Sequence, residues 1–146
     1  MKSKVTTIFA AVGLLLTLAM VSVSAQTPTG AQVNIPFDFT AGKANLKAGS
    51  YTVTRASGTA LKLRSTDGKK TVLINAPLTI GSRDFKAGER LVFNRYGSEY
   101  FLTQVWLTVD SGRQLLTTSA ETNAARELAR QKKGPPERVD IAVRSR

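Results

Sequence analysis

The chain has 146 residues, carries a formal net charge of +11, and contains neither histidine nor cysteine. Without cysteine it forms no disulfide, thiolate nucleophile or zinc–thiolate site, and without histidine it forms no Ser–His or Cys–His catalytic pair and no imidazole metal site. The length suits a single domain. Most hydrolase and metalloenzyme chemistries are therefore excluded before any motif is considered.

The first residues have the pattern of a secretory signal peptide. Two lysines lie within the first four positions, and residues 5–23 carry no charge. Val23 and Ala25 occupy the third and first positions before Gln26, where a signal peptidase accepts such residues. We therefore expect a signal peptide with a helical apolar part over residues 1–25, cleavage between Ala25 and Gln26, and export to the periplasm or the extracellular space. The alternative is an uncleaved N-terminal membrane anchor, because about 20 apolar residues span a bilayer.

The mature chain begins with a polar stretch, residues 26–31, which predicts a flexible lead before a β domain over residues 32–118. From Val33 to Phe39, apolar residues then occupy every second position, which is typical of a half-buried strand. Pro36 has no N–H to donate to a neighbouring strand. This first strand is therefore predicted to lie at a sheet edge or to bulge at the proline.

A turn at residues 46–49 leads into a predicted strand over residues 50–56, and a hairpin follows around Asp67-Gly68. Asp-Gly favours a two-residue turn with positive φ at both central positions. That turn predicts the pairs Ser65–Lys70, Leu63–Val72 and Leu61–Ile74. One face of the hairpin is then apolar, and the other carries Lys62, Arg64, Lys69, Thr71 and Leu73.

This second face gives the first candidate site. Lys62, Arg64 and Lys69 share it, and Lys70 lies close to the turn. Such a surface attracts polyanions, anionic lipid or acidic glycans through a non-specific field. The alternative is an ordinary solvated face that keeps the protein soluble.

A second hairpin is predicted over residues 89–109, with its turn at Gly97-Ser98. Its predicted pairs are Arg95–Tyr100, Phe93–Leu102 and Leu91–Gln104. Both faces are apolar, so we expect a cover on each side. One cover is the opposing sheet, and the other is the C-terminal helix, the first strand, or a second copy of the chain in a homo-oligomer.

The same hairpin gives the second candidate site, an aromatic strip of Arg95, Tyr96, Tyr100 and Trp106. Exposed rings of this kind form carbohydrate platforms, and Arg95 opposite Tyr100 suits a cation–π pair. Aromatic residues in a hairpin with two apolar faces are more often part of the core.

The C-terminal part is predicted to contain a turn at residues 110–112, a short strand at 113–117, and one helix over residues 119–133. Thr118 and Glu121 have the spacing of a capping box, and Gly134-Pro135-Pro136 stops the helix. The basic tail, residues 134–146, has alternating apolar positions. It either adds a strand or stays loose.

These elements predict an all-β fold, an antiparallel sandwich or flattened barrel of about seven strands with one C-terminal helix. Lys47-Ala48-Gly49 recurs as Lys86-Ala87-Gly88. The repeat raises the hypothesis that residues 46–76 and 85–116 are duplicated meanders.

Three stretches carry a resemblance to a known group of proteins: Pro36–Phe39, Leu46–Val53, and Leu91–Leu102 followed by Val105-Trp106. In them the chain resembles a family of small exported bacterial proteins without an assigned activity, over about residues 33–121. The resemblance implies an all-β body with a C-terminal helical extension. It implies no catalytic residue.

No motif for a nucleophile, a phosphate loop, a metal or a cofactor stands out in the sequence. The carboxylates are scattered, and Asp38 with Glu99 is the pair considered for acid–base chemistry. We therefore expect a non-enzymatic binding or structural module of the cell envelope, with an anionic envelope polymer or lipid surface as partner and no nucleic acid. The alternatives are a small β-barrel that binds a hydrophobic ligand and, third, a histidine-free carboxylate enzyme.

Overall fold

The computed structural model describes residues 30–144, which form two β-sheets and one α-helix. Sheet A has the strand order β1-β4-β5-β6, with bounds Ala31–Ile35, Gly49–Arg55, Ala60–Ser65 and Thr71–Asn75. Sheet B has the order β11-β8-β9-β10-β7, with bounds Glu137–Ala142, Arg90–Tyr96, Glu99–Trp106, Ser111–Gln114 and Leu78–Gly81. The short strands β2 (Phe39–Ala41) and β3 (Ala44–Leu46) pair with each other, and β2 also pairs with β9.

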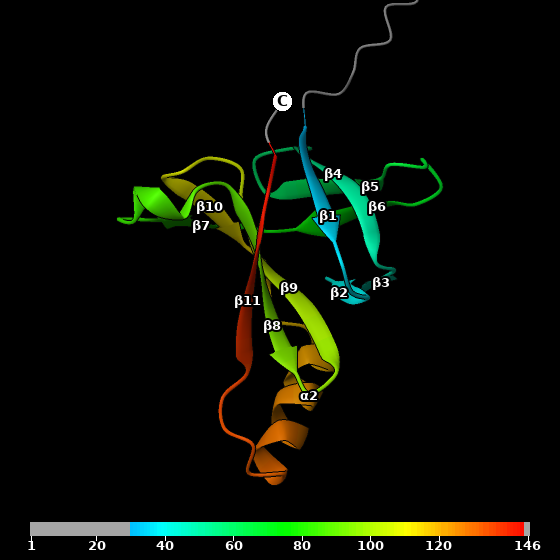
Figure 1. The fold of residues 1–146 in the computed structure, drawn as a ribbon, viewed down its shortest axis with the longest axis vertical. Helices are drawn as coiled ribbons and strands as arrows, with labels where there is room; N and C mark the ends of the chain where they lie inside the picture. The colour runs from blue at the N-terminus through cyan, green and yellow to red at the C-terminus, as the bar shows by residue number, and fades with distance from the viewer. Residues whose placement is uncertain (1–29, 145–146) are drawn as a thin grey trace, which may run out of the picture.

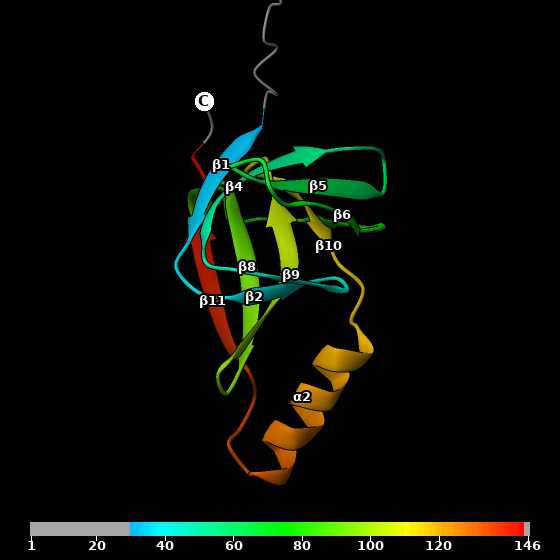
Figure 2. The ribbon, with the colours of Figure 1, turned by 90° about the vertical axis from the view of Figure 1, so that its right-hand side faces the viewer.

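The two sheets pack against each other around one apolar core (Figures 1 and 2). Val53, Leu61 and Leu63 enter it from sheet A, and Leu91 and Phe93 from sheet B. The predicted sandwich agrees with this arrangement, and the flattened barrel was wrong because the sheets do not close into one. The described part has eleven strands where about seven were predicted, because strands of three or four residues are too short to show an alternating pattern.

Strand β1 ends at Ile35, directly before Pro36, and forms one edge of sheet A. The chain then crosses to sheet B, where β2 runs parallel to β9. The predicted edge position is confirmed, but the predicted extent to Phe39 was wrong, because the strand stops before the proline and Phe39 begins β2.

The β5–β6 hairpin has the predicted register, with Leu61 opposite Ile74 and Leu63 opposite Val72. The prediction of positive φ at both turn residues was wrong, since Gly68 alone has it, at 73°. The Gly68 N–H donates to the Ser65 carbonyl, so residues 65–68 form a turn that Gly68 completes.

The β8–β9 hairpin pairs Arg95 with Tyr100 and Phe93 with Leu102, as predicted. The predicted Leu91–Gln104 pair was wrong, because a register shift places Leu91 opposite Val105. The extra residue is Thr103, whose hydroxyl donates to the Val92 carbonyl at 3.1 Å. After such a bulge, the side chains of β9 that would otherwise face the core point outward, and their neighbours point inward. Val105 therefore enters the core, and Trp106 points away from sheet A.

Helix α2 (Ser119–Arg130) lies beside the outer face of this hairpin, the side away from sheet A (Figure 2). Thr118 caps it by accepting from the Glu121 N–H, as predicted. The Glu121 carboxylate does not complete a capping box. It accepts instead from the Tyr96 hydroxyl at 3.2 Å and from the Asn94 amide at 3.4 Å. The helix ends at Arg130 rather than at residue 133.

Strand β10 begins at Ser111, so the predicted turn at 110–112 and strand at 113–117 were placed too late in the chain. Gly112 lies opposite Trp106 in the β9–β10 pairing. A Cβ at Gly112 would lie 2.5 Å from the indole, so the ring occupies the space above a residue without a side chain.

The C-terminal stretch forms strand β11, which pairs with β8 along its whole length, so it is not a loose tail. Gln32 and Arg144 then exchange two backbone hydrogen bonds, of 3.0 and 2.8 Å, which join the edge of sheet A to the end of the chain. As a result the two ends of the described chain lie side by side (Figure 1).

The predicted signal peptide (1–25), the Ala25–Gln26 cleavage site and most of the flexible lead lie outside the described residues. Within residues 30–144, no helix is long and apolar enough to cross a bilayer. The β4–β6 and β8–β10 segments are both antiparallel meanders, which leaves the duplication a hypothesis. The repeated turns differ in detail, since φ is 155° at Gly49 and 64° at Gly88.

Replacing Gly112 by alanine should destabilise the fold by about 1–3 kcal/mol, because the new methyl group overlaps the Trp106 ring. Trp106 is the chain's single tryptophan, so its fluorescence follows urea unfolding without interference. Gly81→Ala is the control, because its nearest non-neighbouring atom lies 4.0 Å from the added carbon. Unchanged stability of Gly112→Ala would contradict this packing.

Candidate functional site

The predicted polyanion-binding residues lie together on the outer face of sheet A. Leu61 and Leu63 of β5 enter the core, so Lys62 and Arg64 between and beside them point away from it. Lys69 lies in the turn that follows, and both Arg64 and Lys69 are exposed. We call Lys62, Arg64 and Lys69 the basic face.

The outer face of sheet A carries no carboxylate among the residues that the structure describes. Its outward positions, fixed by the strand alternation and the pairing, are Gln32, Asn34, Ser50, Thr52, Thr54, Ala60, Lys62, Arg64, Thr71, Leu73 and Asn75. Lys62 and Arg64 therefore have no carboxylate beside them on these strands, and such cations produce a local positive potential.

The acid closest in sequence to the basic face is Asp67, in the β5–β6 turn. Hydrogen bonds from the Ser65 hydroxyl, at 2.6 Å, and from the Lys69 N–H, at 3.0 Å, hold the pKa of Asp67 below its usual value. The Lys69 ammonium lies 4.0 Å from the same carboxylate. The carboxylate therefore organises the turn and offsets only part of the positive charge.

A groove of about 520 Å³ lies beside the basic face, between the turn before β4 and the β5–β6 turn. Lys47, Lys69 and Lys70 line it, and Leu46 and Tyr51 add apolar surface. Lys47 is 2.7 Å from Asp38, and this pair raises the pKa of Lys47 and lowers the pKa of Asp38. The Asp67 carboxylate also lines the groove, and Lys47 and Lys69 each lie beside a carboxylate, so its positive charge is partly compensated.

Asp38 and Glu99, the two carboxylates considered for acid–base chemistry, line one shallow hollow of about 300 Å³. A general acid requires a raised pKa. The pKa of Asp38 is shifted the opposite way, mainly by the hydrogen bond from Lys47. Asp38 is therefore ionised at neutral pH and cannot donate a proton. Within residues 30–144, no group of three or more acidic residues suits a metal ion.

The predicted aromatic strip does not form one exposed surface. Tyr100 stacks on Phe37 with ring centroids 3.8 Å apart, and Arg95 lies over Tyr100 at 5.5 Å, which confirms the predicted cation–π pair. Tyr96 points to the other face of the hairpin, where it contacts Glu121. Trp106 is only 4% exposed. These rings are packing groups, and no flat platform results.

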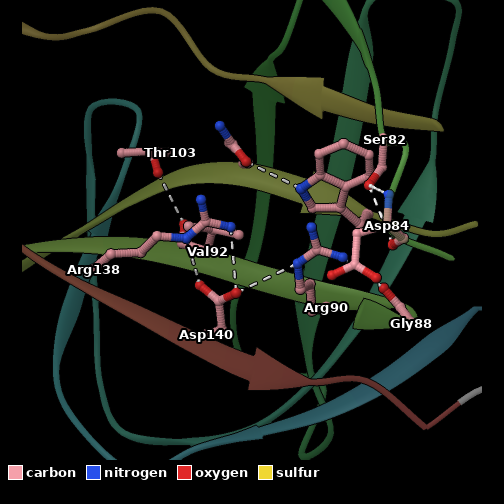
Figure 3. Close-up of polar contacts among 10 residues, drawn as sticks. Ser82, Asp84, Gly88, Arg90, Val92, Thr103, Arg138 and Asp140 are labelled. Atoms are coloured by element: carbon pink, nitrogen blue, oxygen red, sulfur yellow. Dashed lines mark hydrogen bonds and ion pairs between the residues drawn. The ribbon is translucent and has the colours of Figure 1, made fainter. Parts of the chain in front are cut away.

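The structure also contains a polar cluster that sequence reasoning missed, on the outer face of sheet B (Figure 3). Arg90 is 7% exposed and lies 4.6 Å above the centre of the Trp106 ring. Its Nη1 donates to the Gly88 carbonyl at 2.9 Å. Its Nε lies 3.4 Å from Asp140 without the alignment of a hydrogen bond.

Asp140 joins this cluster from β11, where Arg138 also donates to it at 2.9 and 3.3 Å. Because Arg90 belongs to β8, the shared carboxylate clips β11 onto that strand. Arg90 and Asp140 are far apart in the sequence, and only the strand pairing brings them together. Arg90 directly precedes the apolar residues 91–93, and this was the only indication in the sequence that a charge would be buried.

The ion pair at Asp38 makes a prediction for acid unfolding. A carboxylate whose folded pKa is depressed stabilises the fold above its unfolded pKa, near 4, and this contribution is lost as pH falls through the folded value. Asp38→Asn should therefore weaken the pH dependence of the urea midpoint below about pH 5. Asp110→Asn, in an exposed turn, is the control. An identical pH profile for Asp38→Asn and the unmodified protein would contradict the shift.

Removing Arg90 should destabilise the protein by about 2 kcal/mol, since a largely buried charge pair and an aromatic contact are lost together. Arg138→Ala removes the more exposed arginine from the same carboxylate, and its cost should stay below about 1 kcal/mol. Urea unfolding followed by tryptophan fluorescence measures both. Equal losses in the two variants would contradict the clip.

No family model, curated protein or solved structure matches this chain. The resemblance to a family of small exported bacterial proteins therefore stays a prediction.

Proposed function

We propose that the protein is an exported, non-catalytic binding module that holds an anionic component of the cell envelope on its basic face. Export rests on the pattern of residues 1–25, with two early lysines, an uncharged run and Ala25 before the cleavage position. Binding rests on the outer face of sheet A.

The observation that carries this proposal is the separation of charge on sheet A. Lys62, Arg64 and Lys69 lie together, and no acidic side chain interrupts the outward positions of the described strands. Such an arrangement concentrates polyanions, and added salt weakens it because salt screens exposed charges. In the adjoining groove Lys70 adds a further exposed ammonium group, whereas Lys47 is paired with Asp38.

The observations favour neither alternative function. The hollows described above, beside Lys70 and beside Glu99, are open to solvent and carry polar or charged residues, whereas a carrier of hydrophobic ligands needs an enclosed apolar cavity. The space between the sheets is filled by the core side chains. A carboxylate enzyme built on Asp38 and Glu99 would need Glu99 as its proton donor, because the lowered pKa of Asp38 keeps that carboxyl ionised.

A charge-reversal variant, K62E/R64E/K69E, tests the proposal against beads that carry immobilised polygalacturonate and against bacterial envelope fragments. Each cation near an anionic surface contributes about 1 kcal/mol, so the variant should bind at least about tenfold more weakly at low salt. Circular dichroism checks that the substitutions, of which Lys62→Glu is at a half-buried position, leave the fold intact.

The matched control is K43E/K86E/K133E, which has the same net charge and changes exposed lysines elsewhere. It should keep most of the binding. Equal loss in both variants would show that net charge alone attracts the polymer, and it would refute a defined face. Undiminished binding of K62E/R64E/K69E would place the contact elsewhere on the protein.

A further inference from the structure

One apolar side chain stands out on the basic face. Leu73 of β6 is 67% exposed, more than any other large hydrophobic residue in the described part. Its neighbour Ile74 is buried in the core, so the strand alternation turns Leu73 outward. A single exposed leucine is ordinary on a protein surface; its surroundings are what indicate a role.

Leu73 lies among the cations of the basic face. Lys62 is its direct partner in the β5–β6 pairing, and Arg64 is opposite Thr71, two positions away on the same face. Lys69 and Lys70 follow in the turn at the end of the hairpin. Side chains directly or diagonally opposite on one face lie close enough to contact the same partner.

This combination fits a bilayer surface better than the other anionic or apolar partners. A soluble acidic polymer would use the cations and leave Leu73 in water. A second copy of the chain docked on this face would bring Lys62 and Arg64 against their own counterparts, and like charges repel. Anionic lipid provides both headgroup charges for the cations and an apolar layer for the leucine.

We infer that the outer face of β5 and β6 docks on an anionic lipid bilayer, with Leu73 in the interfacial layer and Lys62, Arg64 and Lys69 against the headgroups. This inference rests on the proposed function and names the source of its negative charge. The long lysine and arginine side chains can reach headgroups while their apolar stems lie along the membrane surface.

A label at position 73 tests the insertion directly. The chain has no cysteine, so Leu73→Cys gives a single attachment point for an environment-sensitive dye. Its emission should shift to the blue with vesicles of phosphatidylglycerol and phosphatidylcholine, and stay unchanged with phosphatidylcholine alone. A dye at Leu116→Cys, which is 53% exposed in the connection between β10 and α2, should not respond to either vesicle.

A second variant separates the leucine from the charges. Leu73→Thr introduces a β-branched residue, which strands favour, and removes most of the apolar surface, so its affinity for the anionic vesicles should fall about tenfold. Its binding to polygalacturonate should stay the same. Leu116→Thr is the control and should bind the vesicles as the unmodified protein does.

The outcomes distinguish the two proposals. Binding to polygalacturonate without binding to vesicles, or vesicle binding that Leu73→Thr leaves unchanged, overturns the bilayer inference and leaves the basic face as a polymer site. A dimer that Leu73→Thr dissociates, in light scattering without lipid, also overturns it in favour of a second copy. Failure to bind either probe overturns the proposed function itself.

Discussion

The alternation of side chains along β5 and β6 links the core of this protein to the charge on its surface. Burial of Leu61 and Leu63 provides the apolar contact with sheet B, and the same backbone geometry forces Lys62 and Arg64 to the other side. A shift of one residue in the pairing would bury the cations and expose the leucines. The stability of the sandwich therefore keeps the basic face in place.

Sheet B differs from sheet A because its central hairpin is apolar on both faces. Sheet A covers one face, and on the other α2 contacts β8 while Arg90 lies over the Trp106 ring. Strand β11 then pairs with β8, clipped by Asp140. The side chains of sheet B are thus largely occupied by packing within the chain. On sheet A, no element of residues 30–144 covers the outer face of β5 and β6, where the proposed binding takes place.

Local signals in the sequence predicted the local structure well. The alternating residues of β5 and β6, the Gly97-Ser98 turn and the Thr118 cap each involve residues that are close along the chain. The bulge at Thr103 was missed because it changes the register without changing the composition. The Arg90–Asp140 contact was missed because only tertiary pairing creates it. The alternation placed both the basic residues and Leu73 on one face, and the structure added that Leu73 is 67% exposed there.

Lysine footprinting tests most directly the claim that binding occurs on the outer face of sheet A. The protein is acetylated with and without bacterial envelope fragments, and mass spectrometry follows each lysine. The account predicts that the fragments slow the reaction of Lys62 and Lys69, with Lys43 and Lys86 unaffected, because only the first two lie on the basic face. Protection of Lys43 and Lys86 with full reactivity at Lys62 and Lys69 would contradict it.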